Sequence, residues 1–179
     1  METVTPRATA IPVRGRGSEL TGDEPVADWG AVHDALRRPK SVMWLATNGP
    51  DGQPHVRPVF AAWTGASFFH ASNAGTVKSR TLRADGRCTL TTDIGSLHIV
   101  VDAVAERVTD PATLAEASRA MLEVYDWPTE IAGDQLDAPY GAPTSGGPPF
   151  EVYELTPRTA YGFPTDGKYQ PTRWSFGVA

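Results

Sequence analysis

The stretch VMWLATNGPDGQPHVRPVFAAWTGASFFHA, residues 42–71, decides the fold class. Three segments rich in β-branched and aromatic residues, 42–47, 55–63 and 67–71, are separated by turn sequences that contain glycine. Connections this short leave no room for a crossover helix, so the stretch predicts an antiparallel meander. Pro58 lies inside the second segment and cannot donate a ladder hydrogen bond, which predicts an edge strand or a bulge there.

Outward from this meander, capping residues and helix breakers predict three short helices: one after Asp28, one between Ser72 and Asp85, and one over 111–125. Further strands are predicted at 87–92, 97–108, 150–155 and 158–163, with a long loop at 126–149. About seven short strands without βαβ alternation predict a mainly β (α+β) fold, a closed antiparallel barrel with peripheral helices.

Residues 1–25 are rich in breakers and poor in large apolar side chains, which predicts a disordered tail ahead of one folded domain, 26–179. The 16 basic and 21 acidic residues give a net charge of -5, a balance that argues against a nucleic-acid partner. No apolar run reaches the roughly 20 residues that span a bilayer, and no signal peptide is evident. We therefore expect a cytoplasmic protein without a membrane partner.

The most promising site for chemistry is 72–80, where a strand ends and a helix begins. The start of a helix presents unpaired N–H groups and a partial positive charge, and Lys78 adds a full one. Residues 72–92 carry four basic side chains against Asp85 alone, whereas 102–137 carry nine acids and two arginines. This local concentration of positive charge predicts capture of an anionic ligand, although a solvated helix face would give the same pattern.

Other candidates are weaker. Arg57-Pro58-Val59-Phe60 could lay a bulged strand against a flat ring, and Arg173-Trp174 could cover a pocket or simply close the core. The four histidines stand far apart, so no metal site is predicted, and the position of the single Cys88 in a strand is typical of a core residue. No catalytic acid or base can be assigned.

As a set, three segments resemble the pyridoxamine-phosphate-oxidase-like split β-barrel superfamily, and its flavin/deazaflavin oxidoreductase branch in particular. They are Trp44–Thr47 with Pro50–His55, Lys78–Arg87, and Thr172–Phe176, supported by Glu106–Pro111 and Ala138–Thr144. The resemblance covers about 28–177 in order. One departure is Thr81, which stands where the family commonly has an asparagine.

The resemblance implies a homodimer with cofactor sites between the subunits. It assigns the phosphate to Lys78, with Ser72 and Thr76 as hydrogen-bonding partners and Arg80 and Thr81 on the same helix. The cofactor-binding set is completed by Arg57, Pro58 and Val59 along the ring, and by Arg173 and Trp174 closing the site.

The cofactor implied is coenzyme F420, with FMN as the alternative, and the protein is expected to be an oxidoreductase that passes a hydride to a small planar or unsaturated acceptor. F420 is preferred because its anionic tail would suit a groove lined by Lys78, Arg80 and Arg83. Three alternatives stay open: a non-catalytic binder of flavin, haem or tetrapyrrole, a pyridoxamine-phosphate-oxidase-like FMN enzyme, and a stress or interaction protein that has lost its cofactor.

Overall fold

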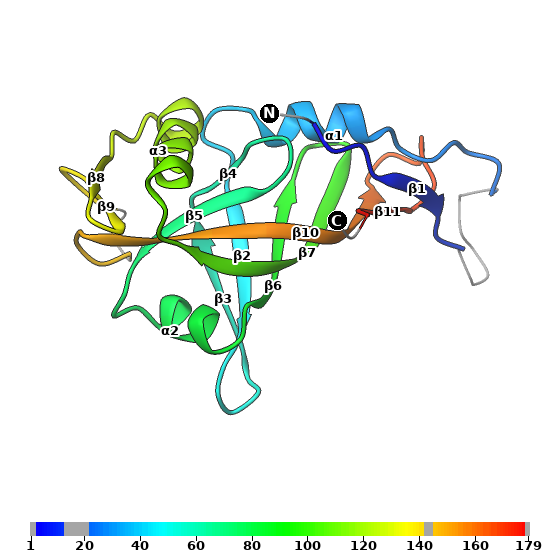
Figure 1. Ribbon diagram of the computed structural model, residues 1–179. Helices are drawn as coiled ribbons and strands as arrows, with labels where there is room; N and C mark the ends of the chain where they lie inside the picture. Colours follow the sequence, from blue (N-terminus) through cyan, green and yellow to red (C-terminus); the bar gives the residue numbers. More distant parts are fainter. Residues whose placement is uncertain (1–2, 13–21, 142–144, 178–179) are drawn as a thin grey trace.

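The computed structural model describes residues 3–12, 22–141 and 145–177 (Figure 1). Its helices are α1 (Trp29–Leu36), α2 (Val77–Ala84) and α3 (Pro111–Tyr125). Its strands are β1 (Arg7–Ala10), β2 (Met43–Asn48), β3 (Pro54–Val59), β4 (Ala61–Trp63), β5 (Phe68–Asn73), β6 (Arg87–Asp93), β7 (Leu97–Val108), β8 (Glu130–Ala132), β9 (Gln135–Asp137), β10 (Phe150–Pro164) and β11 (Thr172–Ser175). Within these ranges, no helix has the length and apolar character needed to cross a membrane.

The strands form an antiparallel barrel with helices around it, which confirms the predicted fold. Neighbours around the barrel are β2, β3 with its continuation β4, β5, β10, β7 and β6, and β6 pairs again with β2. The long strand β10 pairs with β7 along most of its length and with β5 near its start. Figure 1 shows α1 over one end of the barrel and α2 over the other.

The barrel wall changes direction at Phe60, the residue between β3 and β4. His70 Nδ1 lies 2.8 Å from the Phe60 carbonyl oxygen, and the Ala61 N–H donates to the Tyr125 hydroxyl at 3.0 Å. The backbone groups released by the bend are therefore satisfied from β5 and α3, as buried polar groups must be. β3 itself pairs with β2 and ends the ladder, so Pro58 lies on an edge strand, as predicted.

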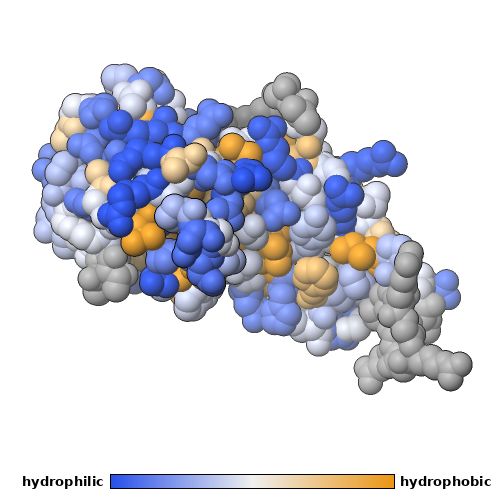
Figure 2. Space-filling model, turned by 90° about the horizontal axis from the view of Figure 1, so that it is seen from below, coloured by the Kyte–Doolittle hydropathy of each residue, from blue (hydrophilic) through white to orange (hydrophobic). Residues whose placement is uncertain are grey.

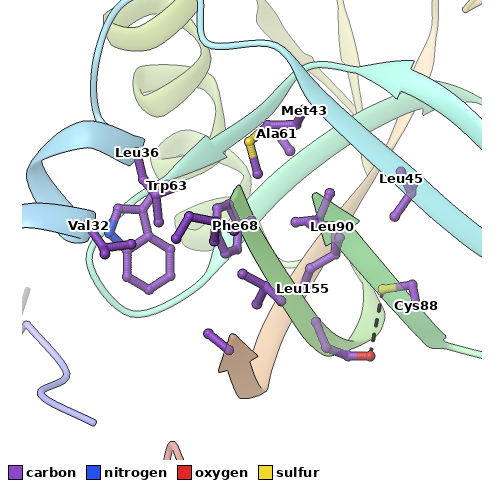
Figure 3. Close-up of a cluster of buried hydrophobic side chains, with 14 of the residues drawn as sticks. Val32, Leu36, Met43, Leu45, Ala61, Trp63, Phe68, Cys88, Leu90 and Leu155 are labelled. Atoms are coloured by element: carbon purple, nitrogen blue, oxygen red, sulfur yellow. Dashed lines mark hydrogen bonds between the residues drawn. The ribbon is translucent and has the colours of Figure 1, made fainter. Parts of the chain in front are cut away.

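Two apolar clusters fill the space on either side of the sheet. One occupies the barrel interior and includes Val32, Trp63, Phe68, Leu90 and Leu155, all at most 1% exposed (Figure 3). The other lies between the sheet and α3 and includes Leu114, Met121 and Phe150. The 3- and 4-residue spacing along α3 places its apolar stripe on the sheet.

Strand β10 corrects the prediction of two separate strands at 150–155 and 158–163. The chain runs as a single strand from Phe150 to Pro164, and its register against β7 shifts between Pro157 and Thr159. Because Pro157 has no N–H to donate, the ladder accommodates it with this irregularity instead of ending.

Two segments predicted to be irregular contain strands. Arg7–Ala10, inside the predicted tail 1–25, form β1 and pair with β11, Arg7 opposite Ser175. The loop 126–149 holds the β8–β9 hairpin, and β9 touches β10 through Leu136 and Phe150. Residues 13–21 and 142–144 lie outside the described residues.

Candidate anion-binding site at the start of α2

Helix α2 begins with a cap built from hydroxyl side chains. The Thr76 side-chain oxygen accepts from the Ser79 N–H at 3.2 Å, and the Ser72 and Thr76 hydroxyl oxygens lie 2.9 Å apart. Two of the predicted site residues, Ser72 and Thr76, are thus brought together. The cap satisfies one of the N–H groups at the helix start and leaves those of Val77 and Lys78 for an external acceptor.

The carbonyl groups before the helix are held by arginines of the helix itself. Arg80 Nη1 donates to the Gly75 carbonyl oxygen, and Arg83 Nη2 donates to the Ala74 carbonyl oxygen at 3.1 Å. Both guanidinium groups therefore help to fix the shape of the 73–76 loop. With its carbonyl groups turned toward these donors, the loop leaves the positive end of the helix open to an anion.

Lys78 carries a positive charge that is largely shielded from solvent. The residue is 6% exposed, and among the described residues no acidic side chain forms an ion pair with it. Burial, and then the positive charge of Arg57 on β3, lower the pKa of the ammonium group. Burial also lowers the pKa of His55, and the positive charges of Arg57 and Lys78 lower it further. Arg57 on β3 and Lys78 on α2 thus place two positive charges near one another, and neither pairs with a carboxylate among the described residues.

His70 lies inside the barrel, near enough for the Lys78 charge to act on it. It is 1% exposed, and its Nε2 has no hydrogen-bond partner among the described residues. Burial is the main reason that its pKa falls to about 4. The hydrogen bond to Phe60 raises the pKa, and the Lys78 charge lowers it further. His70 is therefore neutral at pH 7, with Nδ1–H donating to Phe60 and the Nε2 lone pair unused.

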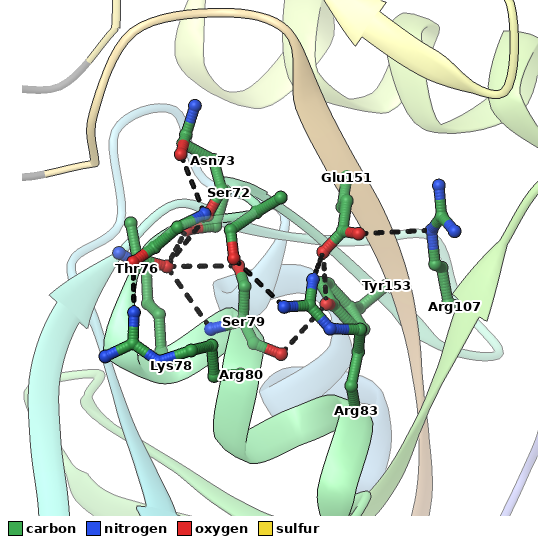
Figure 4. A network of polar contacts seen from close by, with 12 residues as sticks. Ser72, Asn73, Thr76, Lys78, Ser79, Arg80, Arg83, Arg107, Glu151 and Tyr153 are labelled. Carbon is green, nitrogen blue, oxygen red and sulfur yellow. Dashed lines mark hydrogen bonds and ion pairs between the residues drawn. The ribbon is translucent and has the colours of Figure 1, made fainter.

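A buried carboxylate, Glu151 on β10, lies behind the helix start (Figure 4). It stands opposite Ser72 in the β10–β5 register, and its side chain is 6% exposed. Arg83 Nη1 lies 2.5 Å and the Tyr153 hydroxyl 2.7 Å from Glu151 Oε2, while Arg107 Nε lies 3.5 Å from Oε1. None of these contacts was predicted from the sequence. The available signal was the period of two along β10, which puts Glu151 and Tyr153 on the same face as the core residue Leu155.

The predicted β3 residues take different positions. Arg57 and Pro58 are exposed, whereas Val59 is 8% exposed and belongs to the barrel core. Thr81 on α2 is buried and donates to the Thr47 hydroxyl at 2.9 Å, so its side chain ties the helix to β2. Of these four, Arg57 is the one whose charge acts on Lys78.

The two residues predicted to close the site differ in exposure. Arg173 and Trp174 belong to β11, and the Trp174 ring is 0% exposed, packed 5.4 Å from the Trp29 ring. A fully buried ring has no surface to offer a ligand, so Trp174 is a core residue of its own chain. Arg173 is exposed on the other side of the same strand.

Two other potentially reactive side chains in the described part of the chain, Cys88 and Tyr125, are buried. Burial raises the pKa of Cys88 to about 12, so its thiol is not a nucleophile. The Tyr125 hydroxyl is fixed at the bend, and burial raises its pKa to about 12. In the described residues, no three histidine, cysteine or carboxylate side chains gather as a metal site requires.

The surface on the side of α2 and the β2–β3 hairpin is mainly hydrophilic, with separate hydrophobic patches (Figure 2). Val77, the first residue of α2, is itself 41% exposed. The helix start is therefore open to a ligand from outside, while Lys78 beside it is covered.

The family model for pyridoxamine 5'-phosphate oxidase matches residues 30–163, well over half of the chain. The protein belongs to this family.

Solved structures of the same fold carry varied names. A conserved hypothetical protein from Mycobacterium tuberculosis is 20% identical, with a TM-score of 0.61 over 84% of this chain and 92% of that one. An F420 reductase is 22% identical, with a TM-score of 0.50 over 72% and 94%. An FAD-binding protein from Mesorhizobium loti is 19% identical, with a TM-score of 0.55 over 83% and 95%. At these identities the likeness shows the fold alone. No curated protein sequence matches the chain significantly.

Proposed function

We propose that the protein is an oxidoreductase that binds coenzyme F420, or alternatively FMN, at the start of α2, and passes a hydride to a small planar or unsaturated acceptor. The observation that carries this proposal is Lys78, 6% exposed and without a carboxylate partner among the described residues. A covered ammonium group without a counter-ion is unfavourable, and a phosphate would supply that counter-ion.

The residues present fit a phosphate-bearing ring cofactor. Lys78, the free N–H groups of the first helical turn and the guanidinium of Arg57 would hold the phosphate, and β3 would lie along the ring. The cofactor supplies the hydride chemistry, while this chain binds the cofactor and orients it toward the acceptor. Arg83 is neutralised by Glu151, so a groove for the anionic tail of F420 would depend on Lys78 and Arg80.

Titration of the purified protein with F420 and with FMN, followed by fluorescence, tests the proposal. We expect Lys78→Ala to weaken binding of the preferred cofactor at least about tenfold, because a charge-assisted contact is lost. Lys168→Ala is the matched control, since Lys168 is exposed and paired with Asp166. Equal binding by wild type and Lys78→Ala would place the phosphate elsewhere, and micromolar FMN binding without F420 binding would overturn the preference for F420.

We also propose that the protein is a homodimer that pairs through the outer face of β2. Val42, just before β2, is 60% exposed, Trp44 on β2 47% and Val56 on β3 44%. A depression of about 420 Å³ lies between β2, β6 and β7, and Ala46, further along β2, is part of its lining. An apolar face of this kind favours burial against a second copy. Light scattering should report a dimer for wild type and a monomer for Trp44→Glu, with Phe163→Glu as the exposed aromatic control. A dimer unaffected by Trp44→Glu would exclude this face.

A further inference from the structure

We propose that Glu151 is a positioning residue that fixes the start of α2, through Arg83 and Tyr153, in the orientation that receives an anion. The inference rests on the proposed function of that helix start, which it deepens by naming the group that holds the site in place. Glu151 lies on β10, a different element from the helix it orients.

Arg83 makes the first connection between Glu151 and the helix start. This residue, in the last turn of α2, has one guanidinium nitrogen on Glu151 Oε2 and the other on the Ala74 carbonyl oxygen, 3.1 Å away in the loop before the helix. A single side chain thus connects the carboxylate to the segment that leads into the helix start. Without the carboxylate, Arg83 would have no fixed point in the barrel wall.

Tyr153 makes the second connection. Its hydroxyl lies 2.7 Å from Glu151 Oε2 and 3.1 Å from the carbonyl oxygen of Ser79, in the first turn of α2 (Figure 4). The hydroxyl has one proton and so donates to one of these oxygens at a time. Burial, followed by the hydrogen bond to Glu151, raises the pKa of Tyr153 to about 12, so it keeps that proton at neutral pH.

The network continues away from the helix. Arg107 on β7 lies between Glu151 and Asp134, with its Nη2 2.7 Å from Asp134 Oδ2 in the turn of the β8–β9 hairpin. Two arginines and two carboxylates therefore join α2 to a hairpin of the 126–149 region. A buried ion pair contributes little net stability compared with an apolar replacement, whereas it does favour one arrangement over others. We therefore assign this network of two arginines and two carboxylates a role in orienting α2.

Glu151→Gln separates positioning from a simple counter-ion role. If Glu151 only neutralised Arg83, its removal would free a positive charge near the site and strengthen anion binding. Positioning predicts the opposite: a five- to tenfold weaker affinity, roughly, for the phosphate-bearing cofactor, with less than about twofold change for its phosphate-free analogue. The probes are FMN against riboflavin, and F420 against its phosphate-free deazaflavin riboside.

Hydrogen exchange of the cofactor-free full chain supplies a readout that does not depend on a ligand. We expect residues 74–80 to exchange about tenfold faster in Glu151→Gln, with the barrel strands unchanged. Tyr153→Phe, which removes a single hydroxyl, should give a smaller increase at the same residues and covers the case in which Glu151→Gln does not fold. Glu123→Gln is the control, since it breaks the exposed ion pair between Glu123 on α3 and Arg37 at the end of α1.

The outcomes distinguish this proposal from the proposed function. Three results for Glu151→Gln would each overturn the positioning role. They are an unchanged exchange rate at 74–80, an equal increase in exchange rate throughout the chain, and tighter cofactor binding. A wild-type protein that binds neither cofactor would overturn the proposed function, and the exchange measurement would still decide whether Glu151 positions α2.

Discussion

The two ends of the barrel are closed by opposite kinds of side chain. At the α1 end, Trp29 packs edge-on against three aromatic rings, with centroid distances of 5.1 to 6.1 Å. At the α2 end, the buried side chains include Lys78, Glu151 and Thr81. Aromatic packing stabilises the fold directly, whereas buried polar groups have a desolvation cost that hydrogen bonds only offset. This difference agrees with the proposal that the α2 end carries the function, while the α1 end maintains the fold.

Removing a ring from the α1 end should produce the largest loss of stability. Trp174 is 0% exposed and packs closely over Gly162, where an added Cβ would lie 2.6 Å from the ring. We expect Trp174→Ala to lower the free energy of unfolding in urea by about 3–5 kcal/mol, as for other large-to-small core changes. Arg173→Ala, at an exposed position on the same strand, should change it by less than about 0.5 kcal/mol. If Trp174→Ala lost cofactor binding but kept its stability, the ring would be a ligand contact after all.

The barrel could be predicted from the sequence because its signals are local. The turn cluster after Thr47 and the capping pair Asp110-Pro111 each fix an element from a few neighbouring residues. Strand β1 could not be predicted, because Arg7–Ala10 are few and include no large apolar side chain, and their partner strand lies some 165 residues away. Pairing over such a distance depends on the completed barrel.

The site was predictable to the same extent. Ser72, Thr76 and Lys78 surround one helix start and could be placed together from sequence. The sequence could not show whether Trp174 covers a pocket or belongs to the core, since a tryptophan near the end of the chain fits either place equally well. Glu151 was missed because its partners come from α2, β7 and β10, and no sequence spacing records that meeting.

Acid should weaken the α2 end through His70. The pKa is about 4 in the folded protein and 6.5 in the unfolded chain, because burial and the nearby Lys78 charge disfavour the imidazolium. Between these values the unfolded chain binds the extra proton, so stability falls as the pH drops from about 6.5 toward 4. The full effect is about 3 kcal/mol, from 1.36 kcal/mol per pKa unit.

Urea unfolding of His70→Gln across this range measures that effect. The glutamine amide can still donate to Phe60 but does not titrate, so the pH dependence between 4 and 6.5 should become flatter. His98→Gln, at an exposed position on β7, is the matched control for replacing a histidine by glutamine. Identical pH profiles for wild type and His70→Gln would mean that water or movement of Lys78 compensates the charge.

The smallest expected effect compares the helix caps at the two ends. Asp28 caps α1 by accepting from the Ala31 N–H, and Thr76 caps α2 by accepting from the Ser79 N–H. Either residue changed to alanine should cost about 1 kcal/mol of stability, because each leaves one N–H at a helix start unsatisfied. Thr76→Ala should in addition weaken cofactor binding, measured by fluorescence titration, since the same hydroxyl also orders Ser72 beside the proposed phosphate position. Asp28→Ala should leave the affinity unchanged. If Thr76→Ala and Asp28→Ala bound the cofactor with equal affinity, the two ends of the barrel would not differ in function. Both caps would then only stabilise their helices.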